Sequence, residues 1–278
     1  MLRIPGRARN AHHAVMVPSL FVSHGSPMLA LEDSPTARFL DGLGARLDAV
    51  RAVVVASAHD LAPATRVGAH PAPPTVHDFS GFPAALSAIR YPARGDAILA
   101  GRIADALRDA GLPARIDGGH GLDHGAWVPL RRMFPAADRP VVTLSIDPRA
   151  DAAAHAALGR ALSFLPAEDV LVLGSGGMTH DLGALRWHDP GAAPSPIAAA
   201  FADWLGERLL ARDCADVIGW RERAPHAQAN HPTPEHLLPL FVAWGAAGPA
   251  PRAERWHDAV EYAALRLDAF AFHPAGRA

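Results

Sequence analysis

The sequence contains no lysine, and all 26 of its basic residues are arginine. This absence excludes enzymes that hold a substrate or pyridoxal phosphate as a lysine Schiff base. It also excludes the phosphate-loop motif, which requires a lysine. Any carboxylate on a substrate would have to be recognised by arginine.

Cysteine and long apolar runs are also scarce. The single Cys214 excludes disulfides within the chain, iron–sulfur clusters and thiolate zinc sites, and it suits a reducing cytoplasm. The sequence contains no run of about 18 apolar residues, which a membrane-spanning helix would require. A net charge of −2 without a basic run argues against nucleic acid as a partner. A small molecule is therefore the predicted ligand.

Histidine, in contrast, is abundant, with 16 copies in 278 residues. Imidazole titrates near neutral pH and is a common metal ligand. Because thiolate sites are excluded, any metal ion would have to be bound by imidazole and carboxylate groups.

The pattern of the chain predicts an α/β fold: a single domain with a mostly parallel central sheet flanked by helices. We expect residues 1–16 to be a frayed tail and residues 17–278 to form the domain. Continuous Val, Leu and Ile runs are typical of parallel strands buried on both faces. They predict strands at residues 19–23, 52–57, 141–146 and 170–173. Helical spacing and capping residues predict helices at residues 35–47, 96–110, 152–165, 196–210, 234–247 and 254–271.

Three histidines lie in the segments that follow predicted strands. His24 comes after the first, His59 after the second and His180 after the fourth. Ligands of a parallel sheet bind beyond the carboxyl ends of its strands, so these side chains are predicted to share one rim. Each could instead be an ordinary loop histidine, but three such placements favour a metal site. The proline-rich stretch of residues 71–92 is predicted to be a loop near this site.

Two further segments concentrate histidine. The glycine-flanked residues 119–125 contain His120 and His124, and their backbone can approach a ligand closely. In residues 230–236, Thr233 is predicted to cap a helix that begins at Pro234, which places His236 in its first turn. Glu235 would then point about 100° away from His236, and His231 would be held extended before a proline, lining the site entrance.

Two other enzyme classes are disfavoured. Ser175 follows a strand, but the G-x-S-x-G pattern of a hydrolase nucleophile is absent. Thr179 stands where a dinucleotide fingerprint needs its third glycine, which argues against a nicotinamide enzyme.

Seven motifs in order resemble the class III extradiol ring-cleaving dioxygenases, in particular the 4,5-DOPA dioxygenase branch. They are HGSP (24–27), SAH (57–59), HDFSGFP (77–83), LDHG (122–125), LSID (144–147), THDL (179–182) and PTPEH (232–236). The resemblance implies one divalent metal ion, Fe(II) for catalysis, although zinc can occupy the same site. His24, His59 and His236 would be its ligands. His180 would be the acid–base residue or a fourth ligand, and His124 would contact the substrate.

The expected function is therefore oxidative ring opening of a small catechol by O₂, with His231, His120 and Ser26 as further substrate contacts. Two alternatives remain open. One is a zinc-dependent hydrolase, and the other is a metal-binding protein without turnover. The wider superfamily uses two histidines and one glutamate, so Glu235 also remains a candidate third ligand. The sequence does not indicate an oligomeric state.

Overall fold

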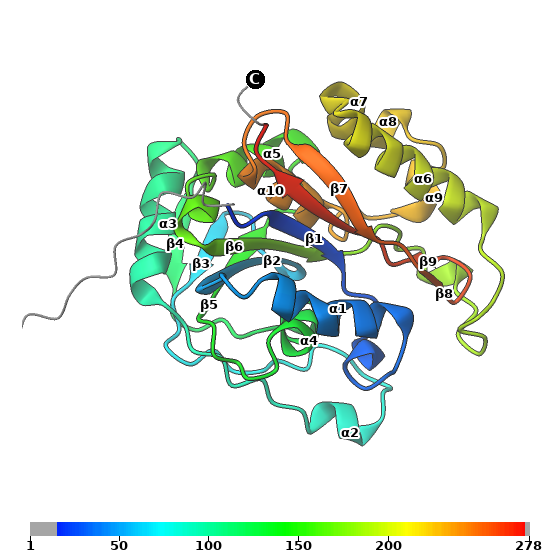
Figure 1. The fold of residues 1–278 in the computed structure, drawn as a ribbon, viewed down its shortest axis with the longest axis horizontal. Coiled ribbons are helices and arrows are strands. Elements are labelled where there is room, and N and C mark those ends of the chain that lie inside the picture. Colours follow the sequence, from blue (N-terminus) through cyan, green and yellow to red (C-terminus); the bar gives the residue numbers. More distant parts are fainter. Residues whose placement is uncertain (1–15, 276–278) are drawn as a thin grey trace, which may run out of the picture.

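The computed structural model describes residues 16–275. The tail predicted for residues 1–16 therefore lies, apart from Met16, outside the described residues. Figure 1 shows a central sheet with helices on both faces. The strands are β1 (Ser19–Ser23), β2 (Ala52–Leu61), β3 (Thr65–Gly68), β4 (Ala114–Asp117), β5 (Val141–Ile146), β6 (Val170–Gly176), β7 (Arg252–His257), β8 (Val260–Glu261), β9 (Leu265–Arg266) and β10 (Ala269–His273).

The helices connect the strands along most of the chain. They are α1 (Pro35–Arg46), α2 (Ala84–Ser87), α3 (Ala97–Asp109), α4 (His124–Met133), α5 (Ala152–Ala161), α6 (Pro196–Ala211), α7 (Cys214–Ile218), α8 (Trp220–Arg223), α9 (Ala227–Asn230) and α10 (Leu238–Ala246). Short 3₁₀ turns lie at Pro27–Ala30, Leu165–Glu168 and Leu182–Ala184. No helix of residues 16–275 is long and apolar enough to cross a bilayer.

The eight-stranded sheet has the order β4-β3-β5-β2-β6-β1-β10-β7. Its centre is parallel, because β2 pairs in parallel with β5 and β6, and β6 pairs in parallel with β1. Antiparallel pairs join β3 to β5 and β10 to β1 and β7. The predicted α/β class and mostly parallel centre are confirmed.

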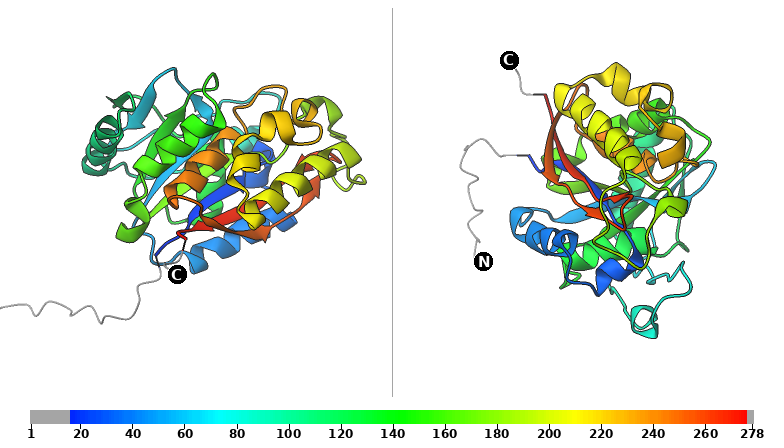
Figure 2. Two further views of the ribbon diagram at one scale, coloured as in Figure 1. Left: turned by 90° about the horizontal axis from the view of Figure 1, so that it is seen from above. Right: turned by 90° about the vertical axis from the view of Figure 1, so that its right-hand side faces the viewer.

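Side chains on both faces of the sheet are buried, which explains the continuous apolar runs of its central strands. Helices α3, α5, α6 and α10 contribute to the core on one face, and α1 and α4 to the core on the other. Figure 2 shows these two layers from the side. Side-chain caps fix helix starts: Ser34 accepts a hydrogen bond from the Ala37 N–H, and Asp123 from the Ala126 N–H.

The helix predicted over residues 254–271 is wrong, because this segment forms β7 to β10. Phe270 and Phe272 enter one core, whereas Ala269 and Ala271 enter the other. This alternation of large and small apolar residues has the period of a strand. The many alanine and leucine residues of the segment favoured a helix in the sequence pattern and hid this alternation. Pairing of β10 with β1 makes the segment extended.

The helix predicted from Pro234 begins later, at Leu238. The Thr233 hydroxyl donates to the Glu235 carboxylate at 2.9 Å and does not cap a helix. The Leu237 N–H bonds to the Pro234 carbonyl, so residues 234–237 form a turn that leads into α10. His236 is therefore held by a turn and not by the first turn of a helix.

Candidate active site

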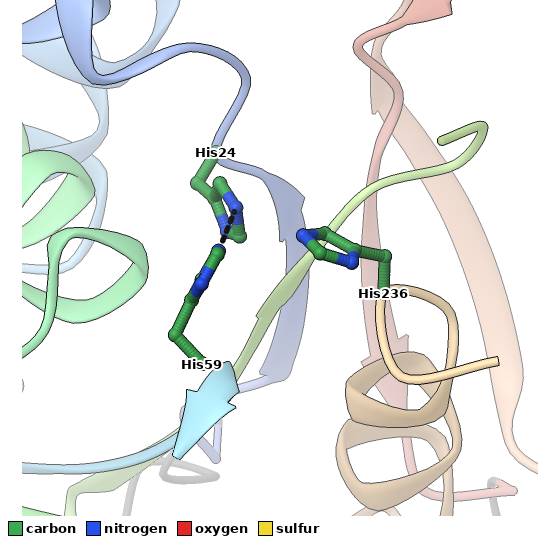
Figure 3. A group of neighbouring side chains, drawn as sticks. All are labelled: His24, His59 and His236. Carbon is green, nitrogen blue, oxygen red and sulfur yellow. Dashed lines mark hydrogen bonds between the residues drawn. The ribbon is translucent and has the colours of Figure 1, made fainter. Parts of the chain in front are cut away.

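Three imidazoles from separate parts of the chain converge at the carboxyl edge of the parallel strands. His24 directly follows β1, His59 lies near the end of β2, and His236 lies on the turn before α10 (Figure 3). One ring nitrogen from each lies within 4.8 Å of the others. The Nε2 atoms of His24 and His59 are only 3.3 Å apart.

The outer nitrogen of each of these rings faces a polar partner: Ser175 and Glu235 form hydrogen bonds with His24 and His236, and the Asp78 carboxylate lies at ion-pair distance from His59. Ser175 Oγ donates to the Gly125 carbonyl at 2.5 Å, so it accepts from His24 Nδ1 at 3.1 Å. His59 Nδ1 lies 3.3 Å from Asp78, and His236 Nδ1 lies 3.1 Å from Glu235. An ionised carboxylate only accepts hydrogen bonds, so Nδ1 carries the proton in His236, and the negative charge facing Nδ1 of His59 favours the same tautomer there.

These tautomers leave a lone pair on each Nε2. Two lone pairs that face each other across 3.3 Å repel, unless a cation lies between them. Two nitrogens that bind one tetrahedral ion at about 2.0–2.1 Å are themselves about 3.3 Å apart. The donor set therefore fits a divalent metal ion.

Burial keeps the three rings neutral, which metal ligation requires. It lowers the pKa of His24 well below the usual value and lowers the pKa of His236 despite the nearby Glu235. Burial, together with His124 and His236, lowers the pKa of His59 to about 3.

Two glycines allow the segments around the site to approach one another this closely. A side chain at Gly125 would meet Ser57 Oγ and the His24 ring, and one at Gly176 would meet the His236 carbonyl. The Gly177 N–H then donates to that same carbonyl at 2.8 Å. This backbone contact fixes the His236 turn against the end of β6.

Two further imidazoles, His180 and His124, flank the first three. The His180 ring stacks on His236 with 3.3 Å between centroids and 8° between planes. Burial, followed by the neighbouring His236 and His231, lowers the pKa of His180 to about 3. The centroid of His124 lies 4.0 Å from that of His59.

Asp78 joins His124 to His59 through one carboxylate. Its Oδ1 accepts from the His124 backbone N–H at 2.9 Å. Its Oδ2 lies 2.9 Å from His124 Nδ1 and 3.3 Å from His59 Nδ1. Although burial alone would raise the pKa of Asp78, its hydrogen bonds and charge interaction with His124 hold it at about 2. The carboxylate is thus ionised and orients both rings.

These imidazoles open onto a cavity of about 230 Å³, consistent with the prediction that the 71–92 loop lies near a site. Phe79 and Phe82 from that loop form part of its wall. Ser26, expected to contact substrate, also lies in the wall. The full lining is His24, Gly25, Ser26, Pro27, His59, Phe79, Phe82, His124, His180, Leu182, Leu185, Trp187, His236 and Leu265.

The structure corrects two expected substrate contacts. His231 does not line the entrance: it is fully buried between Phe201 and Trp220, with Nε2 bonded to the Met178 carbonyl at 3.0 Å. His120 also lies outside the pocket lining, with Nε2 3.5 Å from the buried Asp60. Asp60 follows His59, and successive residues of a strand point to opposite faces, so His120 lies on the side away from the cavity.

Sequence reasoning gave no role to Ser175 or Asp78 at the metal site, and it considered Glu235 as a possible third ligand but not as the partner of a ligating histidine. Each of these residues holds the outer nitrogen of a converging histidine. Glu235 directly precedes His236, a proximity that could have suggested the contact. Asp78 is distant in sequence from both of its partners, so spacing carried no signal.

The fold gathers a histidine cluster that fits a metal ion at the carboxyl edge of a mostly parallel sheet, and comparison with known proteins identifies the family. Residues 18–266 match the model of the catalytic LigB subunit of aromatic ring-opening dioxygenase. The chain belongs to this family of class III extradiol dioxygenases, and within it to the 4,5-DOPA dioxygenase branch.

The relatives span nearly the whole chain. A 4,5-DOPA dioxygenase extradiol of Beta vulgaris is 39% identical over 258 residues, covering 91% of this chain and 96% of the relative. The enzyme of the same name from Escherichia coli K12 is 39% identical over 234 residues, covering 83% and 85%. The crystal structure of an uncharacterized protein from Escherichia coli K12 superposes with a TM-score of 0.78 at 32% identity, covering 92% of this chain and 99% of the other.

Proposed function

We propose that this protein is an iron-dependent extradiol dioxygenase that opens the ring of a small catechol with O₂. The observation that carries the proposal is the convergence of three imidazole lone pairs on a cavity in a chain of the LigB family. His24, His59 and His236 would hold the ion. When bound there, Fe(II) supplies a centre that can hold both catechol oxygens and O₂ and pass electrons between them.

The chain's own residues would orient the substrate and move its protons. We assign the acceptance of a catechol proton to His124, because Asp78 occupies its Nδ1 and leaves Nε2 for the pocket. A carboxylate behind an imidazole stabilises the charge that the ring gains with the proton. The sequence alone favoured His180 for this step, but no carboxylate hydrogen bond supports that ring within residues 16–275.

His180 would act from the other side of the cavity. Its neutral ring, stacked on His236, can accept a hydrogen bond from a substrate hydroxyl, or take up the second catechol proton and return that proton to the product. On this assignment it is a catalytic residue and not a fourth ligand. The apolar side chains around the pair would exclude water from the reacting groups.

The decisive experiment loads the metal-free protein anaerobically with Fe(II) and then adds a panel of catechols under air. We expect O₂ consumption with at least one catechol and a yellow ring-opened product. The same protein loaded with zinc should be inactive, because zinc has no redox chemistry. Equal turnover with both metals would reject the dioxygenase and favour the alternative zinc hydrolase.

A further inference from the structure

Two segments that end on His180 and His236 are joined to each other by backbone hydrogen bonds beside the cavity. The Gly177 N–H donates to the His236 carbonyl, and the His180 N–H donates to the Asn230 carbonyl, both at 2.8 Å. The two imidazoles that end these segments stack with 3.3 Å between their centroids. The stack therefore depends on how the two segments are held together.

A third hydrogen bond between the segments comes from a side chain. His231 is fully buried, and its Nε2 lies 3.0 Å from the carbonyl of Met178, two residues before His180. A carbonyl only accepts hydrogen bonds, so Nε2 carries the proton and donates. Burial lowers the pKa of His231 to about 3, so the ring is neutral near pH 7 and its donor is fixed.

The second ring nitrogen of His231 gains nothing from this place in the fold. Nδ1 is buried without a hydrogen-bond partner among residues 16–275. The ring lies between Phe201 and Trp220, at 5.3 Å and 5.4 Å between centroids. A buried polar atom without a partner costs about 1–3 kcal/mol, so an apolar side chain would pack here at lower cost. What an imidazole adds at this position is its Nε2–H.

The backbone on the other side of Met178 is fixed as well. The Met178 N–H donates to Ser23 Oγ at 3.0 Å, and Ser23 directly precedes His24 at the end of β1. The peptide groups on both sides of Met178 are thus held, one by Ser23 and the other by His231. Loss of the His231 donor would release the peptide group that leads on to His180.

We infer, building on the proposed function, that His231 is a positioning residue for the acid–base residue His180. Its Nε2–H fixes the Met178 carbonyl and thereby keeps the His180 ring stacked on His236. Without the donor, the buried carbonyl loses this bond, at a cost of about 1–3 kcal/mol that a shift of the segment can relieve. Misplacement of a catalytic group by about 1 Å can cost about 10²-fold in rate. His231 is not part of the cavity lining, so it acts only through His180.

Two substitutions of matched shape isolate the donor. His231→Gln places an amide N–H as many bonds from Cα as Nε2, whereas His231→Met places a methyl group there. We expect kcat of the Fe(II)-saturated His231→Met protein to fall by about 10–100-fold. His231→Gln should stay within a few fold of the wild type. In both variants, zinc affinity should change by less than the factor of about 10–100 that follows loss of a ligand's outer partner.

Ring-current shifts report the stack without any turnover. In the diamagnetic zinc-loaded protein, the ring protons of His180 should resonate upfield because they lie over the His236 ring. The spectrum of His180→Ala identifies these resonances. His231→Met should reduce the upfield shift, and His231→Gln should keep it.

His155→Met is the matched control for the loss of a buried imidazole. His155 is also buried, and its Nδ1 lies 2.8 Å from the Asp151 carbonyl, but it belongs to α5 and lies outside the cavity lining. This variant should change neither kcat nor the His180 resonances. If His231→Met does not fold, His231→Phe takes its place, because it keeps an aromatic ring without the donor.

Unchanged His180 resonances in the variant that lacks the donor overturn the inference, and so does a lost stack with unchanged kcat. Failure of His231→Gln to preserve the shift also contradicts it, because the donor would then not be the cause. A loss of zinc affinity as large as that of a ligand's outer partner would show that His231 serves His236 instead. A stack that follows the donor in a wild-type background without O₂ consumption would support the placement of His180 by His231 and reject the dioxygenase.

Discussion

Replacing Asp78 with asparagine tests how the site holds its histidines. The amide oxygen of the new side chain can still accept from the His124 backbone N–H, which Asp78 Oδ1 does at 2.9 Å. The amide nitrogen then replaces Oδ2, which faces Nδ1 of His124 at 2.9 Å and Nδ1 of His59 at 3.3 Å. Both Nδ1 atoms carry protons, so donor would face donor. The rings must turn away or move their proton to Nε2.

The size of the loss follows from these contacts. A His59 ring with its proton on Nε2 cannot ligate a metal through that atom, and loss of such an outer partner of a ligating histidine costs about 10–100-fold in metal affinity. That range corresponds to about 1.4–2.7 kcal/mol. Because His124 loses the same carboxylate, turnover of the fully loaded variant should fall by a further factor of about 10²–10⁴.

The assay is competition for zinc against a coloured chelator, followed by kcat of the Fe(II)-saturated variant. Long-range ¹H–¹⁵N spectra of the imidazoles report the tautomer of His59 directly. Asp96→Asn is the matched control, because Asp96 also accepts a backbone N–H, that of Leu99 at 2.8 Å, but lies at the start of α3. Asparagine caps helices as well as aspartate does, so this control should change neither quantity. A folded Asp78→Asn protein with wild-type zinc affinity and kcat would refute the reasoning.

Three further outcomes are expected. His236→Ala should lose bound metal and all activity, whereas metal retained at full stoichiometry would point to Glu235 as the third ligand. His124→Ala and His180→Ala should both keep metal with kcat reduced about 10²–10⁴-fold, and either variant arriving metal-free would identify that residue as a ligand. The free energy of unfolding of the metal-free protein should decrease as the pH falls from 6.5 towards 3. Burial lowers the pKa of His59 from 6.5 to about 3 in the folded protein, so over this pH range the unfolded chain binds the proton and the folded protein does not. Five histidines in and beside the site have a lowered pKa and act in this direction, whereas Asp123 and Asp268, whose pKa is raised to about 6, act against it. Urea unfolding with a chelator at pH 7.5 and pH 5 measures the difference, and greater stability at pH 5 would contradict it.

The local sequence pattern was sufficient to predict the central strands and the histidines that meet at the edge of the sheet. The apolar runs of β1 and β5 match the predicted strands at residues 19–23 and 141–146. Because parallel strands share one carboxyl edge, the histidines that follow β1 and lie near the end of β2 were expected to meet, and they do. The absence of lysine was equally informative, since it restricted any carboxylate recognition to arginine.

The sequence pattern gave the wrong secondary structure where tertiary contacts determine the backbone conformation. The segment of β7 to β10 was predicted as a helix, and only its pairing with β1 made it extended. The turn that holds His236 depends on the Gly177 N–H from the end of β6, a contact between segments far apart in sequence. For the same reason the helix start expected at Pro234 is replaced by a turn.

The sequence by itself determined the chemistry that is available: imidazole and carboxylate, without lysine and with a single cysteine, on a parallel sheet. Only the tertiary structure decided which of the 16 histidines work together. It buried His231 between aromatic rings and set His120 beside Asp60, away from the cavity. It also placed Asp78 behind two rings at once. The physical reason is that these contacts join residues that are far apart in the sequence and close in space. Short-range sequence patterns report only on neighbouring residues, so they do not predict such contacts.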